Sequence, residues 1–263
     1  MCIFLMFKSV LLAVFIASLA FIGFRLKTRE PETHYRDFSK TRMPKHVAVI
    51  GAAGGLGQGV LSECIAANVS FTAIVRSGPE RITKVPPGSR VAVVSSFHDE
   101  SALREALEGV DALLIVSGVT AGTSDDKALL SKNLHNVRAA MNGAKIKRVL
   151  VINTLILAEP GEPAAWIVRL FKQFPGVVGV GMTDMQGVAD ALSKGALDGL
   201  DWTLVRAGVN AHGSDVRPHA TMDWSEVSFM SVSYRAMARW MLEESVANNY
   251  IQKAPLVSRA RMI

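Results

Sequence analysis

Apolar residues gather in six short runs along the chain, and the segments between several of these runs carry apolar residues at helical spacing. Short runs of this kind are typical of parallel strands that are buried on both faces. Strands that alternate with helices indicate a parallel sheet covered on both sides. The pattern therefore predicts a doubly wound α/β fold with strands at residues 47–50, 70–75, 91–94, 112–116, 149–153 and 202–205.

The helices can be placed by their end signals. Asp99 is a candidate N-cap for a helix that ends at Gly109. A long helix is expected to open at Asp125 and Asp126, where acids suit the positive end of the helix dipole. Its expected buried stripe is Leu130, Leu134, Val137 and Met141. A further helix is predicted at residues 163–174, and another is expected to follow a capping box of Thr183 and Gln186. Residues 207–263 are expected to form a smaller substrate-side lobe, with a helix at residues 234–245 and a short terminal strand.

The first predicted strand leads directly into a glycine-rich turn and then a helix. Gly51, Gly54 and Gly57 recur at a spacing of three residues. In a dinucleotide-binding turn the first glycine permits the sharp turn, the second lets the backbone approach a pyrophosphate, and the third lets helix and strand touch. The helix N-terminus adds free N–H groups and partial positive charge. We expect cofactor contacts from Gly51, Ala53, Gly54, Gly55, Leu56 and Gly57.

The alternative interpretation of this turn is a glycine-rich connection in an unrelated α/β protein. A Walker-type phosphate loop is excluded, because no Gly-Lys-Ser/Thr follows. The favoured interpretation is a Rossmann-like nucleotide-binding domain.

The choice between NADP and NAD depends on the end of the second strand. A site that prefers NAD carries an acid there, which holds the ribose 2′-hydroxyl. This chain has Arg76 instead, and an arginine can pair with the 2′-phosphate of NADP. We therefore predict NADP(H), with NAD as the less favoured cofactor. The alternative role for Arg76 is a solvated side chain at a strand end.

Polar residues also stand at the carboxyl ends of the fourth and fifth strands, where ligands bind in doubly wound sheets. Ser117 and Gly118 follow one strand, and Asn153 and Thr154 end the next. We predict that Ser117, Gly118 and Asn153 contact the cofactor and that Thr154 hydrogen-bonds a substrate oxygen, which makes it the candidate catalytic residue. Ordinary strand-end capping is the alternative for each of them.

The N-terminal segment is apolar enough to be a membrane anchor. A helix over residues 3–24 would be about 33 Å long, which spans a hydrocarbon core of about 30 Å. Arg25, Lys27 and Arg29 follow, so the positive-inside rule predicts a single-pass anchor with the domain in the cytoplasm. The expected organisation is an anchor with its basic flank at 1–29, a linker at 30–44 and the NAD(P)-binding domain at 45–263.

Two other functions of this segment stay open. Small residues near Ser18 and Ala20 suit a cleaved secretory signal, and the lack of acids before Glu30 suits a mitochondrial presequence.

Composition narrows the partners further. The chain has 263 residues and a net charge of +6, with several of the basic residues beside the apolar N-terminus. No nucleic-acid-binding motif is visible, so we expect no nucleic-acid partner. Two cysteines argue against a disulfide framework, and the six histidines show no metal-ligand spacing, so no metal site is expected.

Several stretches resemble the atypical short-chain dehydrogenases/reductases, in the NmrA-like and biliverdin/flavin-reductase-like group. They are VAVIGAAGGLG at 47–57, VRSG at 75–78, RVLVINT at 148–154, LDGLDWTLVRAG at 197–208 and SVSYRAMARWML at 231–242. The resemblance implies a Rossmann-like domain that binds NADP through the glycine turn and Arg76. It also places Ser96 near the adenine, at a position where the group often carries an acid.

Two departures weaken the transfer of catalytic detail. Serines replace the Gly-Asp that often follows the third strand, and residues 183–186 lack the His or Lys that the group often carries there. GAAGGLGQ and SGVTAGTSDD also resemble malate dehydrogenase, but that family has an acid in place of Arg76 and a longer substrate domain.

The catalytic apparatus of classical short-chain dehydrogenases is absent. Those enzymes use Tyr-x-x-x-Lys, in which the lysine lowers the tyrosine pKa for proton transfer. The three tyrosines here, Tyr35, Tyr234 and Tyr250, have no lysine four residues on. Two hypotheses follow: a membrane-anchored NADPH-dependent reductase of a small conjugated or carbonyl acceptor, or a non-catalytic NADP-binding sensor or accessory subunit of a membrane complex.

Overall fold

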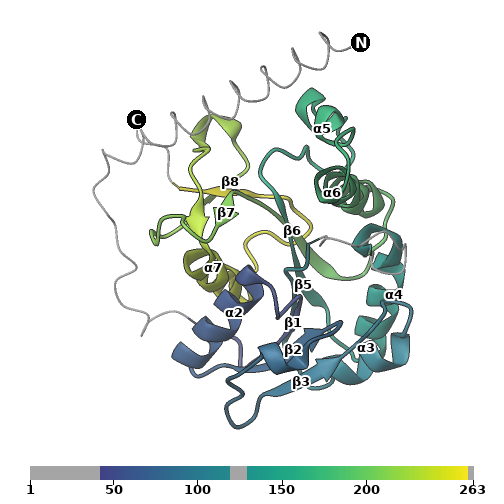
Figure 1. Ribbon diagram of the computed structural model, residues 1–263, viewed down its shortest axis with the longest axis vertical. Helices are drawn as coiled ribbons and strands as arrows, with labels where there is room; N and C mark the ends of the chain where they lie inside the picture. Colours follow the sequence, from purple (N-terminus) through teal and green to yellow (C-terminus); the bar gives the residue numbers. More distant parts are fainter. Residues whose placement is uncertain (1–41, 119–128, 260–263) are drawn as a thin grey trace. The chain divides into compact units, whose positions relative to one another are not determined.

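The computed structural model describes residues 42–118 and 129–259, and these residues build one eight-stranded sheet between two layers of helices (Figure 1). Seven strands run parallel, and the edge strand β8 is antiparallel to β10. In spatial order the strands are β3 (Arg90–Val93), β2 (Ser70–Val75), β1 (His46–Ile50), β4 (Ala112–Ile115), β5 (Arg148–Thr154), β6 (Asp201–Ala207), β10 (Leu256–Ser258) and β8 (His219–Thr221). The predicted Rossmann-like parallel sheet is confirmed.

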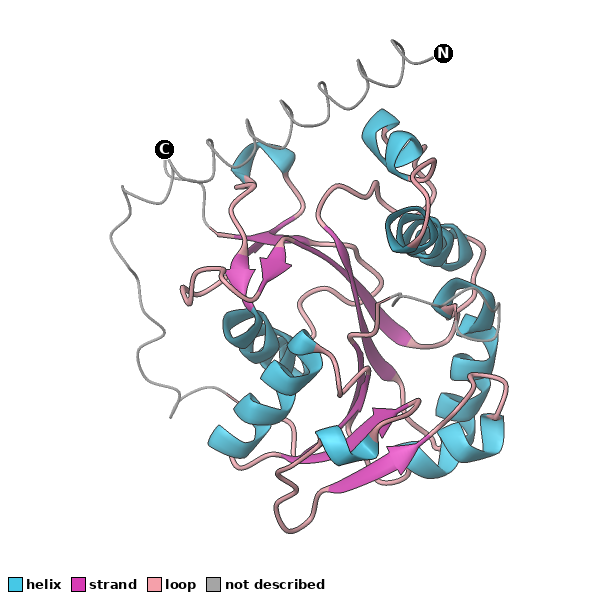
Figure 2. Cartoon of the chain, in the orientation of Figure 1, coloured by secondary structure: helices cyan, strands magenta, loops and turns pink. Residues whose placement is uncertain are grey.

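The central strands are buried on both faces, as their continuous apolar runs predict. Val47 and Val49 of β1 belong to one core cluster, and Ala48 and Ile50 belong to the other. This division follows the two-residue period of a strand. Helices α2 (Gly55–Ala66) and α7 (Tyr234–Ala247) cover the first face, and α3 (Glu100–Leu107), α4 (Leu130–Gly143) and α6 (Val177–Ser193) cover the second (Figures 1 and 2). The short helix α5 (Trp166–Phe171) packs against α6.

The C-terminal residues are only in part a separate lobe. The strand β10 lies between β6 and β8 and so completes the main sheet, and α7 packs on α2. Strands β7 (Val209–Asn210) and β9 (Val232–Ser233) form a second, two-stranded sheet. The 3₁₀ turns η1 and η3 span Pro79–Arg81 and Trp224–Glu226. The expectation of a distinct substrate-side lobe was therefore too simple, because the terminal strand satisfies the free edge of β6.

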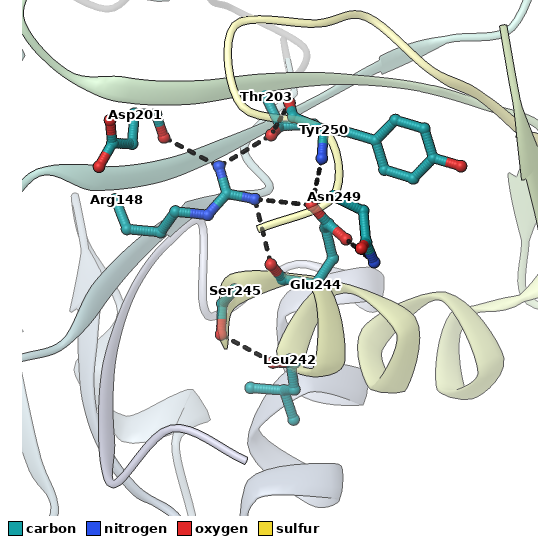
Figure 3. Close-up of polar contacts among 8 residues, drawn as sticks. All are labelled: Arg148, Asp201, Thr203, Leu242, Glu244, Ser245, Asn249 and Tyr250. Carbon is teal, nitrogen blue, oxygen red and sulfur yellow. Dashed lines mark hydrogen bonds and ion pairs between the residues drawn. The ribbon is translucent and has the colours of Figure 1, made fainter. Parts of the chain in front are cut away.

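A buried polar network joins α7 to the sheet (Figure 3). The guanidinium of Arg148 on β5 lies 3.1 Å from the Glu244 carboxylate and donates to the Asp201 carbonyl and the Thr203 hydroxyl, both at 2.8 Å. The Glu244 carboxylate also accepts from the Tyr250 N–H at 2.9 Å. These bonds fix the C-terminal end of α7 against β5 and β6 and lead the chain towards β10.

The predicted helix ends have mixed outcomes. The Asp99 carboxylate accepts from the Ala102 N–H at 2.9 Å, so the predicted N-cap of α3 is confirmed. The described part of the long helix begins at Leu130, whereas Asp125 and Asp126 lie outside the described residues. The Thr183–Gln186 capping box was wrong, because α6 begins at Val177 and both residues lie inside it. The first turns of α6 hold valines and glycines, which are weak helix formers, so its true start was hidden.

The predicted anchor at residues 3–24 lies outside the described residues. Within residues 42–118 and 129–259, no helix has both the length and the apolar character that crossing a membrane requires.

Candidate functional site: a glycine-lined cleft at the strand ends

The turn between β1 and α2 has the geometry that its glycines predict. Gly51 has a φ of +88°, and an added Cβ would lie 2.7 Å from the backbone nitrogen of Ser117. A Cβ at Gly57 would overlap the Gly51 carbonyl oxygen and lie 2.7 Å from Cα of Ala52. The first glycine is thus required by its conformation and by a close approach to the end of β4. The third glycine is required by direct contact between the helix and the turn.

The first turn of α2 is free of a side-chain cap. Gly54 is the N-cap residue and has extended φ and ψ angles of −80° and 170°. The leading N–H groups of a helix that lacks a cap suit an anion, and the helix dipole adds positive potential there. Gly55 has a second function that the glycine pattern did not indicate, because a Cβ there would lie 2.5 Å from the Tyr234 ring on α7. Leu56 is buried in the core beneath the turn.

A cleft of about 320 Å³ opens beside this turn, at the carboxyl ends of β1, β2, β3 and β4. Most of the predicted cofactor contacts line it, and several residues that sequence reasoning missed line it as well. The predicted lining residues are Gly51, Ala53, Gly54, Arg76, Ser96, Ser117 and Gly118, and the additional polar ones are Ser77, Arg81, Ser95 and Asp184.

One end of the cleft is basic. Arg76 and Ser77 follow β2, and Arg81 ends the 3₁₀ turn η1. The side chain of Gln58 on α2 donates to the Arg81 carbonyl at 3.3 Å, which ties this turn to the glycine turn. Among the described residues that line the cleft, Asp184 is the single acid, and it comes from α6. The charges of this site therefore suit a ligand with phosphate groups.

Asp184 has a structural function that explains its position. Its carboxylate accepts from the Leu130 N–H at 3.3 Å and from the Ser131 N–H at 2.9 Å, so it caps α4 from a neighbouring helix. No local signal could have revealed this cap, because the partners are more than fifty residues apart in sequence. The same carboxylate faces the positive end of α4, which partly offsets its charge.

Asn153 and Thr154 lie at the end of β5 but do not line the cleft. The Asn153 side chain donates to the Met185 carbonyl at 3.0 Å and accepts from the Thr154 N–H at 2.7 Å. The residue is buried, so these bonds give it a structural use in holding α6 to β5. Thr154 is half-buried, and its carbonyl accepts from the Leu157 N–H at 3.2 Å.

The loop after Thr154 is fixed by Arg206, a fully buried residue of β6. Its guanidinium donates to the Ala254 carbonyl at 2.7 Å, to the Leu157 carbonyl at 3.0 Å and to Glu159 at 3.0 Å. Burial lowers the pKa of this guanidinium, and Glu159 opposes the shift. Arg206 belongs to the DWTLVRAG stretch. Its contacts explain why an arginine stands there: the side chain joins β6 to the segment that leads into β10 and to the loop that leaves β5.

The two described tyrosines are both used in packing. The Tyr234 ring lies against Gly55 and Gly59, and the Tyr250 hydroxyl donates to the Ala220 carbonyl at 2.8 Å. Burial, and secondarily the Glu244 carboxylate, raise the pKa of Tyr250. Neither residue lines the cleft. No group of three or more His, Cys, Asp or Glu residues that could hold a metal occurs among the residues that the structure describes.

Comparison with known proteins assigns this site to a family. The model of the NAD(P)H-binding family matches residues 51–246, from the first glycine of the turn to the end of α7. The chain belongs to the NAD(P)H-binding family. The resemblance that the sequence motifs indicated is thereby confirmed.

A curated relative of this NAD(P)H-binding protein is the 4-hydroxy-2-methyl-3-oxo-4-farnesyl-3,4-dihydroquinoline-1-oxide ketoreductase of Stigmatella aurantiaca. The two are 28% identical over 118 residues, which cover 44% of this chain and 35% of the relative. The chain thus matches about a third of that relative's length.

Solved structures share the fold at low identity. The oxidoreductase ylbE of Lactococcus lactis has a TM-score of 0.61 at 17% identity and covers 82% of this chain and 92% of its own. A short-chain dehydrogenase/reductase of Veillonella parvula in complex with NADP has a TM-score of 0.58 at 14% identity, with coverage of 82% and 95%. A candidate NADH-flavin reductase of Streptococcus pneumoniae has a TM-score of 0.60 at 19% identity, with coverage of 83% and 100%.

Proposed function

We propose that this NAD(P)H-binding protein is an NADPH-dependent reductase of a small conjugated or carbonyl acceptor. The observation that carries the proposal is the basic end of the cleft, where Arg76, Ser77 and Arg81 meet at the end of β2. The ribose 2′-phosphate of NADP carries two negative charges near neutral pH. Two guanidinium groups and a serine hydroxyl bind such a phosphate better than they bind the uncharged 2′-hydroxyl of NAD. The uncapped start of α2 suits the pyrophosphate.

If NADPH binds in this cleft, the protein has to orient the cofactor and the acceptor and to leave room for a proton donor. Bound NADPH supplies the hydride, so reduction of an acceptor needs only a proton in addition. The glycine turn binds and orients the dinucleotide, and Ser117 and Gly118 line the cleft beyond it. With no tyrosine in the described lining, we assign the proton to water. The ketoreductase relative, whose name describes a conjugated ring ketone, supports an acceptor of this class.

Nucleotide titration tests the cofactor preference. Arg76→Ala and Arg81→Ala are each expected to weaken NADPH binding by about ten- to a hundredfold, because a charge-assisted hydrogen bond contributes about 1.5–3 kcal/mol. NADH binding should change little in both variants. Arg104→Ala on α3, an exposed arginine outside the cleft, is the matched control. Equal affinity of the unmutated protein for NADPH and NADH would remove the basis of the proposal.

Thr154 is proposed to hydrogen-bond the acceptor oxygen, and a separate experiment tests it. The proposal is supported by its place at the carboxyl end of β5, where its backbone N–H donates to Asn153 and its carbonyl accepts from the Leu157 N–H. Thr154→Val should lower kcat by about five- to a hundredfold, the effect of losing about 1–3 kcal/mol, and should leave NADPH affinity unchanged. An unchanged rate would exclude Thr154 from the reaction.

A second candidate function is a non-catalytic NADP-binding sensor or accessory subunit. The observation that favours it is the structural use of both described tyrosines, which leaves the cleft without the usual proton donor. A screen of NADPH oxidation over quinones, flavins and aldehydes separates the two functions. Tight NADPH binding without turnover of any acceptor would favour the sensor.

We also propose that residues 3–24 anchor the protein in a membrane, with the domain on the cytoplasmic side. The proposal is supported by the apolar run that ends at Phe24 and by the basic residues that follow it. Alkaline carbonate should leave the full chain in the membrane fraction. Its release into the supernatant, or a mature N-terminus near Phe21, would contradict the anchor.

A further inference from the structure

Helix α5 and the start of α6 expose an unusual number of large apolar side chains. Trp166 is 73% exposed, Leu170 44%, Val177 43% and Val178 50%. We call residues 166–178 the α5–α6 elbow. Isolated apolar residues are common on protein surfaces, but a group of this size within one short segment marks an interaction surface.

The elbow is a built structure and not a loose loop. The Phe171 and Phe174 rings pack at a centroid distance of 5.7 Å, and Val168 of the same helix α5 is fully buried in the core. Gly176 turns the chain with a φ of +71°. A Cβ at Gly179 would overlap the Phe174 carbonyl oxygen, so the turn lies directly on the first turn of α6. The exposed side chains are therefore displayed from a fixed backbone, at the outer end of α6 (Figure 1).

The charges around these side chains indicate the partner. Arg169 and Lys172 lie in the elbow and are exposed, and the sequence has no acid between Glu162 and Asp184. A tryptophan and aliphatic side chains interleaved with cations are typical of segments that lie in the interface of an anionic bilayer. The long stems of Arg169 and Lys172 can reach lipid phosphates while the apolar side chains enter the acyl region.

The length of chain before the described domain points to the same partner. The basic flank of the apolar residues 3–24 ends at Arg29, and residues 30–41 separate it from Arg42, the first residue of the domain described above. A linker this short spans at most about 40–45 Å, so an anchored domain stays close to the bilayer. Such a short tether gives a binding surface on the domain a high effective concentration near the bilayer, so even a low intrinsic affinity for lipid is enough for contact.

We propose that the α5–α6 elbow docks onto the surface of an anionic lipid bilayer, as a membrane contact in addition to the proposed N-terminal anchor. Trp166, Leu170 and Val178 enter the interface, and Arg169 and Lys172 contact lipid phosphates. The proposal does not depend on reductase activity, and the carbonate extraction described above tests the anchor separately.

A site-specific fluorophore tests the contact in the full chain. Val178→Cys is made in a Cys2→Ser background, reconstituted with vesicles of phosphatidylcholine and phosphatidylglycerol, and labelled with an NBD dye. Cys64 can stay, because it is fully buried and burial raises its pKa to about 12. Val85→Cys is the matched control, since Val85 is 44% exposed on the loop between η1 and β3. Trp166→Cys serves as a second labelled position in the elbow if Val178→Cys does not fold.

The dye in the elbow should emit at shorter wavelength on vesicles than in buffer, and doxyl-labelled lipids should quench it several-fold more strongly than the dye at residue 85. Adding Arg169→Glu and Lys172→Glu should reduce that quenching. Equal quenching at the two positions would overturn the proposal. So would a signal that grows with protein density but resists lipid quenchers, which would indicate a second copy on this surface. A blue shift that persists in detergent, without quenching by lipid, would indicate that residues 3–24 cover the elbow. That result would also overturn the proposal.

Discussion

The buried pair of Arg148 and Glu244 offers the sharpest test of how the fold is held together. Their side chains are only 6% and 2% exposed, and the two groups lie 3.1 Å apart. Arg148→Met would leave the Glu244 carboxylate buried without its cation. Glu244→Leu would leave the guanidinium buried without its anion. Removing one partner of a buried pair typically costs about 3–5 kcal/mol, because the charge that remains is uncompensated.

For a domain of this size, each kcal/mol shifts the melting temperature by about 2–4 °C, so either single substitution should lower it by about 6–20 °C. The double variant should lose less than the sum of the two, because it buries no unpaired charge. Thermal unfolding of the four proteins, followed by far-ultraviolet circular dichroism, gives the coupling free energy.

The neighbouring pair of Arg217 and Glu243 is the control. These groups lie 3.4 Å apart, but the Arg217 side chain is 67% exposed, so Arg217→Met should cost at most about 1 kcal/mol. The reasoning fails if Arg148→Met costs no more than Arg217→Met. It also fails if the double variant loses as much free energy of unfolding as Arg148→Met and Glu244→Leu together. The two charges would then not interact.

Three further predictions concern the turn, the thiol and the first strand. Gly57→Ala should abolish NADPH binding or weaken it by about tenfold or more, because the new Cβ overlaps the Gly51 carbonyl; calorimetric titration showing unchanged affinity would contradict this. Burial raises the pKa of Cys64 from 9.0 to about 12, so the folded state stays protonated while the unfolded state ionises. Stability should therefore fall as pH rises above 9.0, and a thiol reagent should modify Cys64 no faster than the protein unfolds; rapid modification of the native protein would refute the assignment. Burial, and secondarily Arg90, lower the pKa of His46 below 6.5, so the unfolded state takes up a proton first and stability should fall as pH drops through 6.5. His46→Gln should make the free energy of unfolding less dependent on pH in this range; an unchanged slope would exclude His46 as the cause of the pH dependence.

The sequence predicted the geometry of the turn between β1 and α2, where the limits are local to the backbone. Gly51 and Gly57 could be assigned because a turn and a helix contact impose steric limits that only glycine meets. Arg76 could be placed because it directly follows a strand. Arg81 and Asp184 were missed as lining residues because the fold brings them to the cleft from η1 and α6.

The misplaced start of α6 has a similar cause. Thr183 and Gln186 have the spacing of a capping box, yet the helix continues through them because α6 packs on α4 and α5. Tertiary packing outweighs the low helix propensity of the residues at its start. Asn153 shows the same limit from the other side, because a polar residue at a strand end gives no local sign that its amide joins β5 to α6. Contacts between distant segments decide each of these cases.

The position of β10 has a consequence for how the protein is made. This strand comes from residues 256–258, yet it lies inside the sheet, with β6 on one side and β8 on the other. Until residues 256–258 have left the ribosome, one edge of β6 therefore has unpaired backbone N–H and C=O groups, and β8 has no neighbouring strand. Open edges invite pairing with other chains, so the nascent domain is exposed to aggregation until residues 256–258 have been synthesised. A premature stop at Ala254 would make that exposure permanent, although it would leave every residue of the cofactor cleft in place.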